Sequence, residues 1–431
     1  MNKGVDRRAA LALLCLVSLL GCSRCKFQDP ASPPAPIKTH VIWSLPVDSL
    51  GQNDMPVSGN IAYRGLPGQG GVEAINLDTG AIVWKHVGFA SLGYGGVIMG
   101  NDLYFPDISK PDATILWWLK ADTGKIMGKL TVSDGDPTDS ASTQPYLFGM
   151  FQMAGDNRCI YYGCWIYDGI KPVGVVRVNV DAITQYGTDG TGNPLYKATP
   201  EIIYSSSDYH QTMITKPYFE NGVVYFIITD INNTQPTATN WIIAMDESTK
   251  HILWQIQPKY ISGGDRNEIL SVGSDLLITD AGLGLVQKSD GTIIYETPGL
   301  AQGAGDGGGC IANGKVYATN AADSNNGVTS NNCYDIASGA KLWGQHYTQT
   351  DLGSTPAVAH NIEWLATEDG VYFYNATTGT PLGSCTDFYG TGDAANSNFI
   401  YNGNIWIVSS MSTITAVKLD LSLDSQGNIE R

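Results

Sequence analysis

The sequence predicts an all-β fold built from repeated four-stranded units, and three observations support this. Its composition suits short strands and tight turns, with 50 glycines and only 15% charged residues in 431 positions. One stretch of strand, turn and strand recurs along the chain. A second signal, typical of β-hairpins, precedes each copy.

The recurring stretch is first seen as "EAINLDTGAIVWKH", Glu73 to His86, where a Thr-Gly turn joins two apolar runs. Neighbouring copies lie about 40 to 48 residues apart, the period of a propeller or solenoid. "RVNVDAITQYG", Arg177 to Gly187, fills the one long gap as a degenerate copy. The turn glycines align as Gly80, Gly124, Gly291, Gly339 and Gly379, with Lys250 in the equivalent place.

Before each copy, two apolar runs flank a two-residue turn rich in Gly, Asn or Asp, as in "YFENGVVYFI" and "IANGKVYAT". Such turns need positive φ, which Gly and Asn tolerate. Eight hairpins of this kind occur. Hairpin and recurring stretch together predict a four-stranded antiparallel unit, and eight such units that cannot bury both faces alone predict a ring.

We therefore predict a single eight-bladed β-propeller over residues 39–422, followed by a tail at 423–431. The last copy stops before its fourth strand, while "HVIWSLPV" near the N-terminus has that strand's pattern with no hairpin before it. Residues Val41 to Leu45 are therefore expected to complete the last blade and close the ring.

The repeat resembles that of the pyrroloquinoline-quinone-like (PQQ-like) β-propeller superfamily. The resemblance implies that tryptophans dock each blade on its neighbour. Tyr295 is a conservative replacement, whereas Gly128 and Gly383 depart from the pattern, so their blades are expected to dock more loosely. The matching tryptophans are Trp84, Trp254 and Trp343.

The aspartates and glycines of the repeat are interpreted as structural, because a turn is needed in every blade and a catalytic group only once. A short carboxylate before the bend can accept hydrogen bonds from backbone N–H groups, and glycine permits the turn's φ. The residues so assigned are Asp78, Asp122 and Asp246, with Gly80, Gly124 and Gly339.

Residues 1–21 have basic residues before a short apolar run, a pattern that predicts a lipoprotein signal peptide. "LLGC" resembles a bacterial lipobox, which implies palmitate-type acylation of Cys22 and cleavage before it. Ser23, next to Cys22, favours the outer membrane. Residues 22–38 are rich in proline and predict a semi-extended tether.

The formal charge of −16 excludes nucleic-acid binding by phosphate neutralisation. Six cysteines lie beyond Cys22, but their pairing stays open, and none has zinc or haem spacing. "GTDGTGNP" at Gly187 has calcium-loop composition without EF-hand spacing and is interpreted as a plain loop. Insertions at 133–144, 185–209 and 231–240 break the repeat and are the best candidates for a binding surface.

Two functions fit these features. BamB-type lipoproteins of outer-membrane protein assembly resemble this chain in lipobox and repeat, which implies a monomeric, non-enzymatic scaffold that binds an envelope protein. The alternative is a PQQ-dependent oxidoreductase, whose relatives bind pyrroloquinoline quinone and calcium. No motif here supports either cofactor: there is no vicinal cysteine pair, and few basic residues could hold a tricarboxylated quinone. We expect no catalytic and no metal residues.

Overall fold

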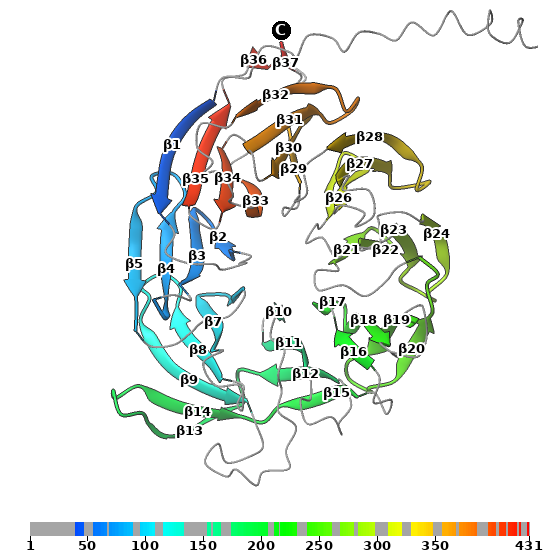
Figure 1. The fold of residues 1–431 in the computed structure, drawn as a ribbon. Coiled ribbons are helices and arrows are strands. Elements are labelled where there is room, and N and C mark those ends of the chain that lie inside the picture. The colour runs from blue at the N-terminus through cyan, green and yellow to red at the C-terminus, as the bar shows by residue number, and fades with distance from the viewer. Residues whose placement is uncertain are drawn as a thin grey trace, which may run out of the picture.

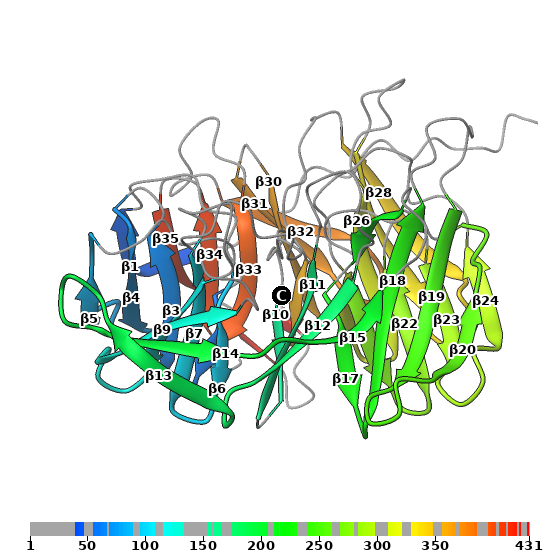
Figure 2. The ribbon, with the colours of Figure 1, turned by 90° about the horizontal axis from the view of Figure 1, so that it is seen from below.

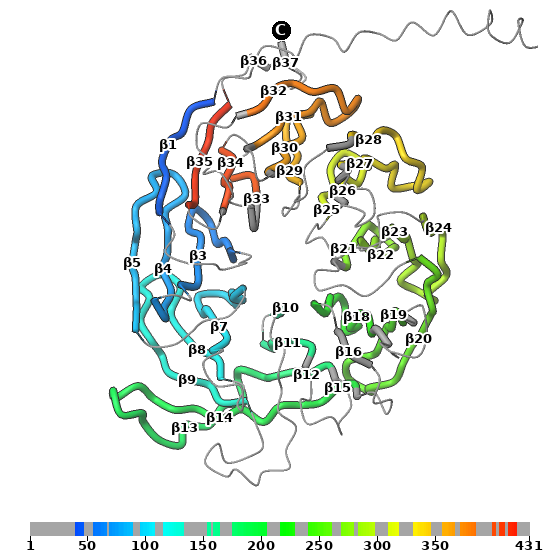
Figure 3. Tube along the Cα trace, viewed as in Figure 1, coloured from blue at the N-terminus to red at the C-terminus, as the bar shows by residue number. Residues whose placement is uncertain are grey.

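The computed structural model describes residues 39–46, 55–66, 69–88, 95–107, 115–132, 153–156, 158–164, 174–205, 211–214, 216–230, 239–260, 268–279, 283–297, 309–320, 329–347, 356–367, 370–385, 395–401, 405–410, 413–419, 422–423 and 429–430. These residues form eight antiparallel blades arranged in a ring, as predicted (Figure 1). A second view shows the blades standing side by side around the ring (Figure 2), and the Cα trace follows the same circuit (Figure 3). Within these ranges there is no helix, and hence none that could span a membrane.

Blades 1, 5, 6 and 7 have the predicted order, with four consecutive strands from the ring centre outward. Blade 1 is β2 (Val57–Ser58), β3 (Ile61–Leu66), β4 (Gly71–Asn76) and β5 (Ile82–His86). Blade 5 is β21 (Glu268–Val272), β22 (Asp275–Thr279), β23 (Leu283–Gln287) and β24 (Ile293–Thr297). Blade 6 is β25 (Gly309–Ala312), β26 (Lys315–Asn320), β27 (Thr329–Asp335) and β28 (Lys341–Tyr347). Blade 7 is β29 (Ala357–Ala359), β30 (Ile362–Thr367), β31 (Gly370–Asn375) and β32 (Pro381–Cys385).

Blades 2, 3 and 4 depart from that order. Blade 2 carries two extra strands on its outer edge, and the innermost position of blade 4 is shared by two strands, β16 and β17, that both pair with β18. Blade 2 is β6 (Val97–Met99), β7 (Asp102–Asp107), β8 (Ile115–Lys120) and β9 (Ile126–Val132), extended by β14 (Pro194–Ala198) and β13 (Ile183–Thr188). Blade 3 is β10 (Met153–Gly155), β11 (Cys159–Cys164), β12 (Gly174–Asn179) and β15 (Glu201–Ser205). Blade 4 is β16 (Gln211–Ile214), β17 (Tyr218–Glu220), β18 (Val223–Asp230), β19 (Thr239–Asp246) and β20 (Ile252–Ile256).

The ring closes as the sequence predicts. Blade 8 consists of β33 (Ala395–Tyr401), β34 (Ile405–Ser410) and β35 (Thr413–Leu419), and its outermost strand is β1 (Thr39–Pro46) from the N-terminal end. Strands β1 and β35 are antiparallel, with Val41 opposite Val417 and Leu45 opposite Ile414. In the segment expected as a tail, β36 (Ser422–Leu423) pairs with β37 (Ile429–Glu430).

The hairpin turns have the conformation that their sequences demand. Asn313 and Gly314 both have positive φ, at 52° and 70°, as do His360 and Asn361, at 50° and 57°. Two successive residues of positive φ define the type I′ turn, whose twist matches that of the two strands it joins. Local turn chemistry therefore sets the register of these hairpins.

One part of the predicted repeat is wrong. Residues Arg177 to Gly187 were expected to form the third strand, turn and fourth strand of blade 3, and β12 is indeed the third strand. After the turn, however, β13 leaves the blade, and the fourth strand is β15, further along the chain. The β13–β14 hairpin joins blade 2 instead, where β14 lies parallel to β9. A parallel partner on an outer edge carries no local signature, so the repeat pattern could not reveal it.

Candidate functional site: the altered contacts of blades 2 to 4

Most neighbouring blades share one docking contact, in which an aromatic ring on the outermost strand covers the turn glycine of the next blade. A Cβ atom on Gly124 would lie 2.5 Å from Cδ2 of Trp84, so the ring rests directly on the glycine. The Trp84 indole Nε1 donates to the Ala121 carbonyl oxygen at 3.0 Å. The same pairing places Trp43 on Gly80, Trp254 on Gly291 and Trp343 on Gly379, with indole hydrogen bonds to Leu77, Lys288 and Ala376.

Glycine is required in these turns for two reasons. Gly80, Gly124 and Gly339 have φ of 70°, 67° and 68°, which disfavours any residue with a Cβ, and the covering ring leaves no room for one. Tyr295 covers Gly339 in place of a tryptophan. Its buried hydroxyl has no hydrogen-bond partner in the described part of the chain, so the polar half of this docking contact is lost.

The aspartate prediction is correct at Asp246 and wrong at Asp78 and Asp122. Asp246 Oδ1 accepts hydrogen bonds from the Thr249 N–H and hydroxyl groups, which lower the pKa of its carboxyl to about 2. In blade 1 the corresponding acceptor is Asn76, four residues before the glycine. Asp78 and Asp122 lie only two residues before their glycines. Asp78 accepts from Asn60 and Tyr401, and Asp122 accepts from the hydroxyl of Thr123.

The docking contact is replaced at blade 2. Gly128 occupies the tryptophan position, and the space above it is filled by the β13–β14 hairpin, with the Pro194 carbonyl and the Tyr196 ring against the glycine. Tyr196 also packs edge-on against Trp118, with ring centroids 5.4 Å apart. The hairpin therefore supplies the missing ring.

The expectation that blades 2 and 7 dock loosely is therefore wrong. Among the described residues, the cores between blades 2 and 3 and between blades 7 and 8 each hold eleven buried apolar residues, against eight between blades 1 and 2. At blade 7, where Gly383 replaces the tryptophan, Trp364 stacks on Trp406 of blade 8 at 4.7 Å. In both places aromatic rings from other strands restore the contact.

Between blades 3 and 4 the docking contact is replaced by charged groups. Opposite Arg177, in the register position of the tryptophan, blade 3 has Glu201. Further along the same strand, the ring of Tyr204 lies 4.9 Å from that of Phe226 in blade 4. The turn of blade 4 has Lys250 instead of glycine, with φ of 59°. Lys250 Nζ reaches back to Glu201 Oε1 of blade 3 at 2.6 Å.

Arg177 on β12 links this ion pair to the rest of the interface. Its guanidinium binds Glu201 of its own blade and Glu247 in the turn of blade 4. Burial opposes the charge on Arg177, but the hydrogen bonds that its guanidinium donates to both glutamates prevail and raise its pKa. Lys250 and Arg177 lower the pKa of Glu201. Arg177 and Glu201 therefore remain ionised across the neutral range. Sequence reasoning missed this network, although the absent tryptophan and the Lys250 substitution pointed to it.

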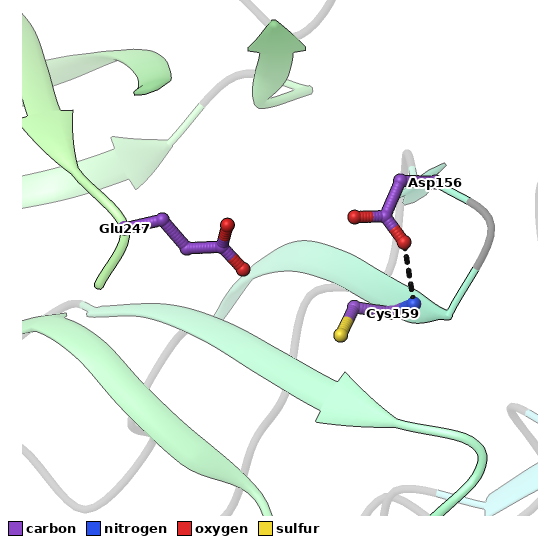
Figure 4. Close-up of side chains that lie close together, drawn as sticks. All are labelled: Asp156, Cys159 and Glu247. Carbon is purple, nitrogen blue, oxygen red and sulfur yellow. Dashed lines mark hydrogen bonds between the residues drawn. The ribbon is translucent and has the colours of Figure 1, made fainter. Parts of the chain in front are cut away.

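Asp156, Cys159 and Glu247 lie together at the same interface, with one ligand atom of each within 4.8 Å of the others (Figure 4). Their oxygen atoms are already bound: Asp156 accepts from the Cys159 N–H at 2.7 Å, and the Tyr161 hydroxyl donates to Glu247 at 2.5 Å. Burial raises the pKa of the Cys159 thiol, so it stays protonated. A protonated thiol beside an arginine-bound carboxylate does not suit calcium, which prefers oxygen ligands. The geometry fits a structural inter-blade network.

The candidate calcium loop is likewise closed by its own donors. Asp189 Oδ1 accepts from the Thr191 and Asn193 N–H groups at 2.9 Å each, and Asp189 Oδ2 binds Lys129 Nζ at 2.9 Å. Burial works against ionisation, but the Lys129, Thr191 and Asn193 hydrogen bonds lower the pKa of Asp189. The loop is a turn of the β13–β14 hairpin, tied by Lys129 to β9.

Several predicted features fall outside the described residues, namely Cys22 with its signal and tether, the insertion at 133–144, and residues 231–238 of the third insertion. The described part of the insertion at 185–209 forms strands β13 (in part), β14 and β15. Cys159 and Cys333 are free thiols. Thus all three insertions, and two of the three interfaces that lack the aromatic–glycine contact, fall in blades 2 to 4 or the connections between them; the third such interface is at blade 7.

No protein-family model and no curated protein matches the sequence. Solved structures share the fold. A europium-containing methanol dehydrogenase has a TM-score of 0.61 at 11% identity, covering 88% of this chain and 93% of its own. The computationally designed Ika8 protein has a TM-score of 0.57 at 14% identity, and the match covers 87% of this chain and 98% of the Ika8 chain. Quinohemoprotein alcohol dehydrogenase from Comamonas testosteroni has a TM-score of 0.58 at 13% identity, and the match covers 91% of this chain and 77% of the dehydrogenase chain. The match to BamB from Moraxella catarrhalis covers 90% of this chain and 99% of the BamB chain at 12% identity, but its TM-score of 0.38 is too low to support an argument. These likenesses show the class of fold, a β-propeller, and leave the activity of this chain open.

Proposed function

We propose that this chain is a non-enzymatic binding module of the bacterial cell envelope, anchored by a lipid on Cys22, which holds a protein partner on blades 2 to 4. The observation that carries the proposal is the β13–β14 hairpin. Four strands suffice for a blade, yet the chain leaves blade 3 to place this hairpin on the outer edge of blade 2. Insertions in repeat proteins commonly form the surface that partners contact.

The exposed side chains of this sector suit a protein partner. Tyr186 on β13 is 53% exposed, and Ile202 on β15 is 42% exposed. Tyrosine is enriched in protein interfaces because its ring buries a large area while its hydroxyl stays hydrated. The lipobox and the propeller fold support the finer proposal that the partner is a component of outer-membrane protein assembly.

Site-specific photo-cross-linking tests the proposal. A photoreactive residue replaces Tyr186 in the full chain, and the matched control replaces Val83, which is 49% exposed on blade 1. We expect position 186 alone to capture a defined envelope protein from intact cells. An outer-membrane assembly component supports the finer proposal, and any other envelope protein removes that role. No capture at 186, or equal capture at both positions, would refute the binding surface.

The alternative is a PQQ-dependent oxidoreductase, since the dehydrogenases above share this fold. It is tested by titrating the purified protein with pyrroloquinoline quinone and calcium ions while following absorbance and dye reduction. The binding-module proposal expects neither saturable binding nor turnover. Saturable quinone binding coupled to dye reduction would replace that proposal with an enzymatic one.

A further inference from the structure

The interface between blades 6 and 7 has the smallest apolar core found among the described residues. Its buried apolar side chains form one cluster of three residues and one of two. The core between blades 7 and 8, by comparison, is a single cluster of eleven buried residues. Two wholly buried polar residues, Glu363 on β30 and Asn331 on β27, lie at the same interface. The members of the two clusters are Tyr317, Cys333 and Ala376, and Leu365 and Tyr374.

Glu363 is buried without a compensating charge from the described part of the chain. Its side chain is 0% exposed, and neither carboxyl oxygen has a hydrogen-bond partner within the described ranges. Burial disfavours the carboxylate and raises its pKa to about 8, with the Asn331 amide opposing the shift. The structure therefore holds Glu363 as a neutral carboxylic acid.

The groups around Glu363 are neutral too. Cys333 on β27 and Tyr317 on β26 face it, and burial raises the pKa of Cys333 to about 12 and that of Tyr317 further. Tyr374 on β31 is its cross-strand neighbour. The charged residues of blade 6 nearest this thiol, Lys315 and Asp335, act on Cys333 and do not contribute to the shift at Glu363. His360 lies exposed in the turn before β30.

Glu73 in blade 1 shows the contrasting case. It is 4% exposed, and its carboxylate lies 3.5 Å from both Arg64 Nη1 and Lys85 Nζ. Two cations there compensate the buried charge. Among the residues that the structure describes, no comparable cation contributes to the electrostatics of Glu363.

We propose that the interface between blades 6 and 7 is an acid-stabilised contact of the ring: Glu363 carries a proton while the interface is closed and releases it to water when the interface opens. An acid whose pKa is higher in the closed state than in the open state stabilises the closed state. This stabilisation is complete below the open-state pKa and is lost as pH rises from the open-state pKa to the closed-state pKa. The window therefore runs from 4.5, the ordinary value, to about 8. Within it, opening increases about tenfold per pH unit. This inference does not depend on the proposed binding role.

Hydrogen exchange of the full chain tests this proposal. Exchange of amides in β27, β30 and β31 is measured at about pH 5.5 and about pH 7.5, corrected for intrinsic exchange rates, in the wild type and in Glu363→Gln. We expect opening of these strands to increase about 100-fold in the wild type and to stay constant in the variant. Amides of β3 and β4 in blade 1 should not respond.

Two further variants separate Glu363 from other titrating groups. His360→Asn removes the histidine in the turn before β30, and asparagine tolerates the same positive φ. If Glu363 is the group that responds to pH, this variant should keep the wild-type response. Glu73→Gln should keep it as well. An unchanged response in Glu363→Gln, or equal opening in blade 1, would overturn the proposal. If Glu363→Gln does not fold, infrared spectroscopy of the wild type at about pH 6.5 decides: a protonated carboxyl band supports the proposal, and its absence overturns it.

Discussion

The docking contact makes a quantitative prediction at Gly124. Replacing Gly124 with alanine adds a single methyl group where φ is +67° and where the nearest atom of Trp84 would be 2.5 Å away. An ordinary van der Waals contact between carbon atoms is about 3.5 to 4.0 Å. The indole ring must therefore move by about 1 Å, which strains its 3.0 Å hydrogen bond to Ala121.

The cost has three parts. Placing an alanine in the left-handed region costs about 1 to 2 kcal/mol. Overpacking against the ring costs about 1 to 3 kcal/mol, and the weakened indole hydrogen bond up to about 1 kcal/mol. We expect Gly124→Ala to lower the free energy of unfolding by about 3 to 4 kcal/mol.

Gly59→Ala is the matched control. Gly59 has φ of +61°, but nothing lies within 4 Å of a Cβ there, so only the backbone cost of about 1 to 2 kcal/mol applies. Urea denaturation followed by far-ultraviolet circular dichroism measures both variants. If Gly124→Ala costs no more than Gly59→Ala, the ring does not rest on the glycine and the docking argument fails.

Two other substitutions test the remaining contacts, and a third tests the lipid anchor. Tyr196→Ala uncovers Gly128 and should lower the free energy of unfolding by about 2 to 4 kcal/mol in urea denaturation. Tyr186→Ala removes a half-exposed ring and one 3.4 Å hydroxyl contact with Thr131, and should cost about 1 kcal/mol or less; equal costs would contradict the role of Tyr196. Arg177→Met removes the cation that bridges Glu201 and Glu247 and should lower the free energy of unfolding by up to about 3 kcal/mol. Arg158→Met, at an ion pair whose arginine is 77% exposed, should be neutral. Cys22→Ser should move the protein from the membrane to the soluble fraction, and unchanged fractionation would refute lipidation.

The ring was predictable because its signals are local and repeated. The Asn-Gly pair at Asn313 requires positive φ wherever it occurs, so hairpins can be counted without knowing their neighbours. The closing strand was found because the last copy lacked a fourth strand that the N-terminus supplied. By contrast, "PLYKA" at Pro194 shows a strand without showing which edge it joins, and β14 pairs in parallel with β9.

The charged network was missed for a related reason. Lys250 aligned with the turn glycines and was treated as their equivalent, because the turn needs positive φ and Lys250 adopts it. Its side chain is accommodated where no aromatic ring covers the turn. Whether a ring covers a turn depends on the preceding blade. The identity of residue 250 is therefore informative only together with the absence of a tryptophan from β15, the fourth strand of blade 3.

The altered contacts also couple the proposed partner surface to the stability of the ring. In blades 1, 4 and 6 the docking tryptophans belong to the repeat itself. In blade 2, Tyr196 and Ala198 of the inserted hairpin are part of the core between blades 2 and 3. A ligand that binds only the folded hairpin must therefore stabilise that core by mass action, so a genuine partner of this surface should raise the unfolding temperature of the ring as its concentration increases. A ligand bound on blade 1 would also stabilise the folded ring, but its effect would survive Tyr196→Ala, whereas that of a hairpin ligand would not.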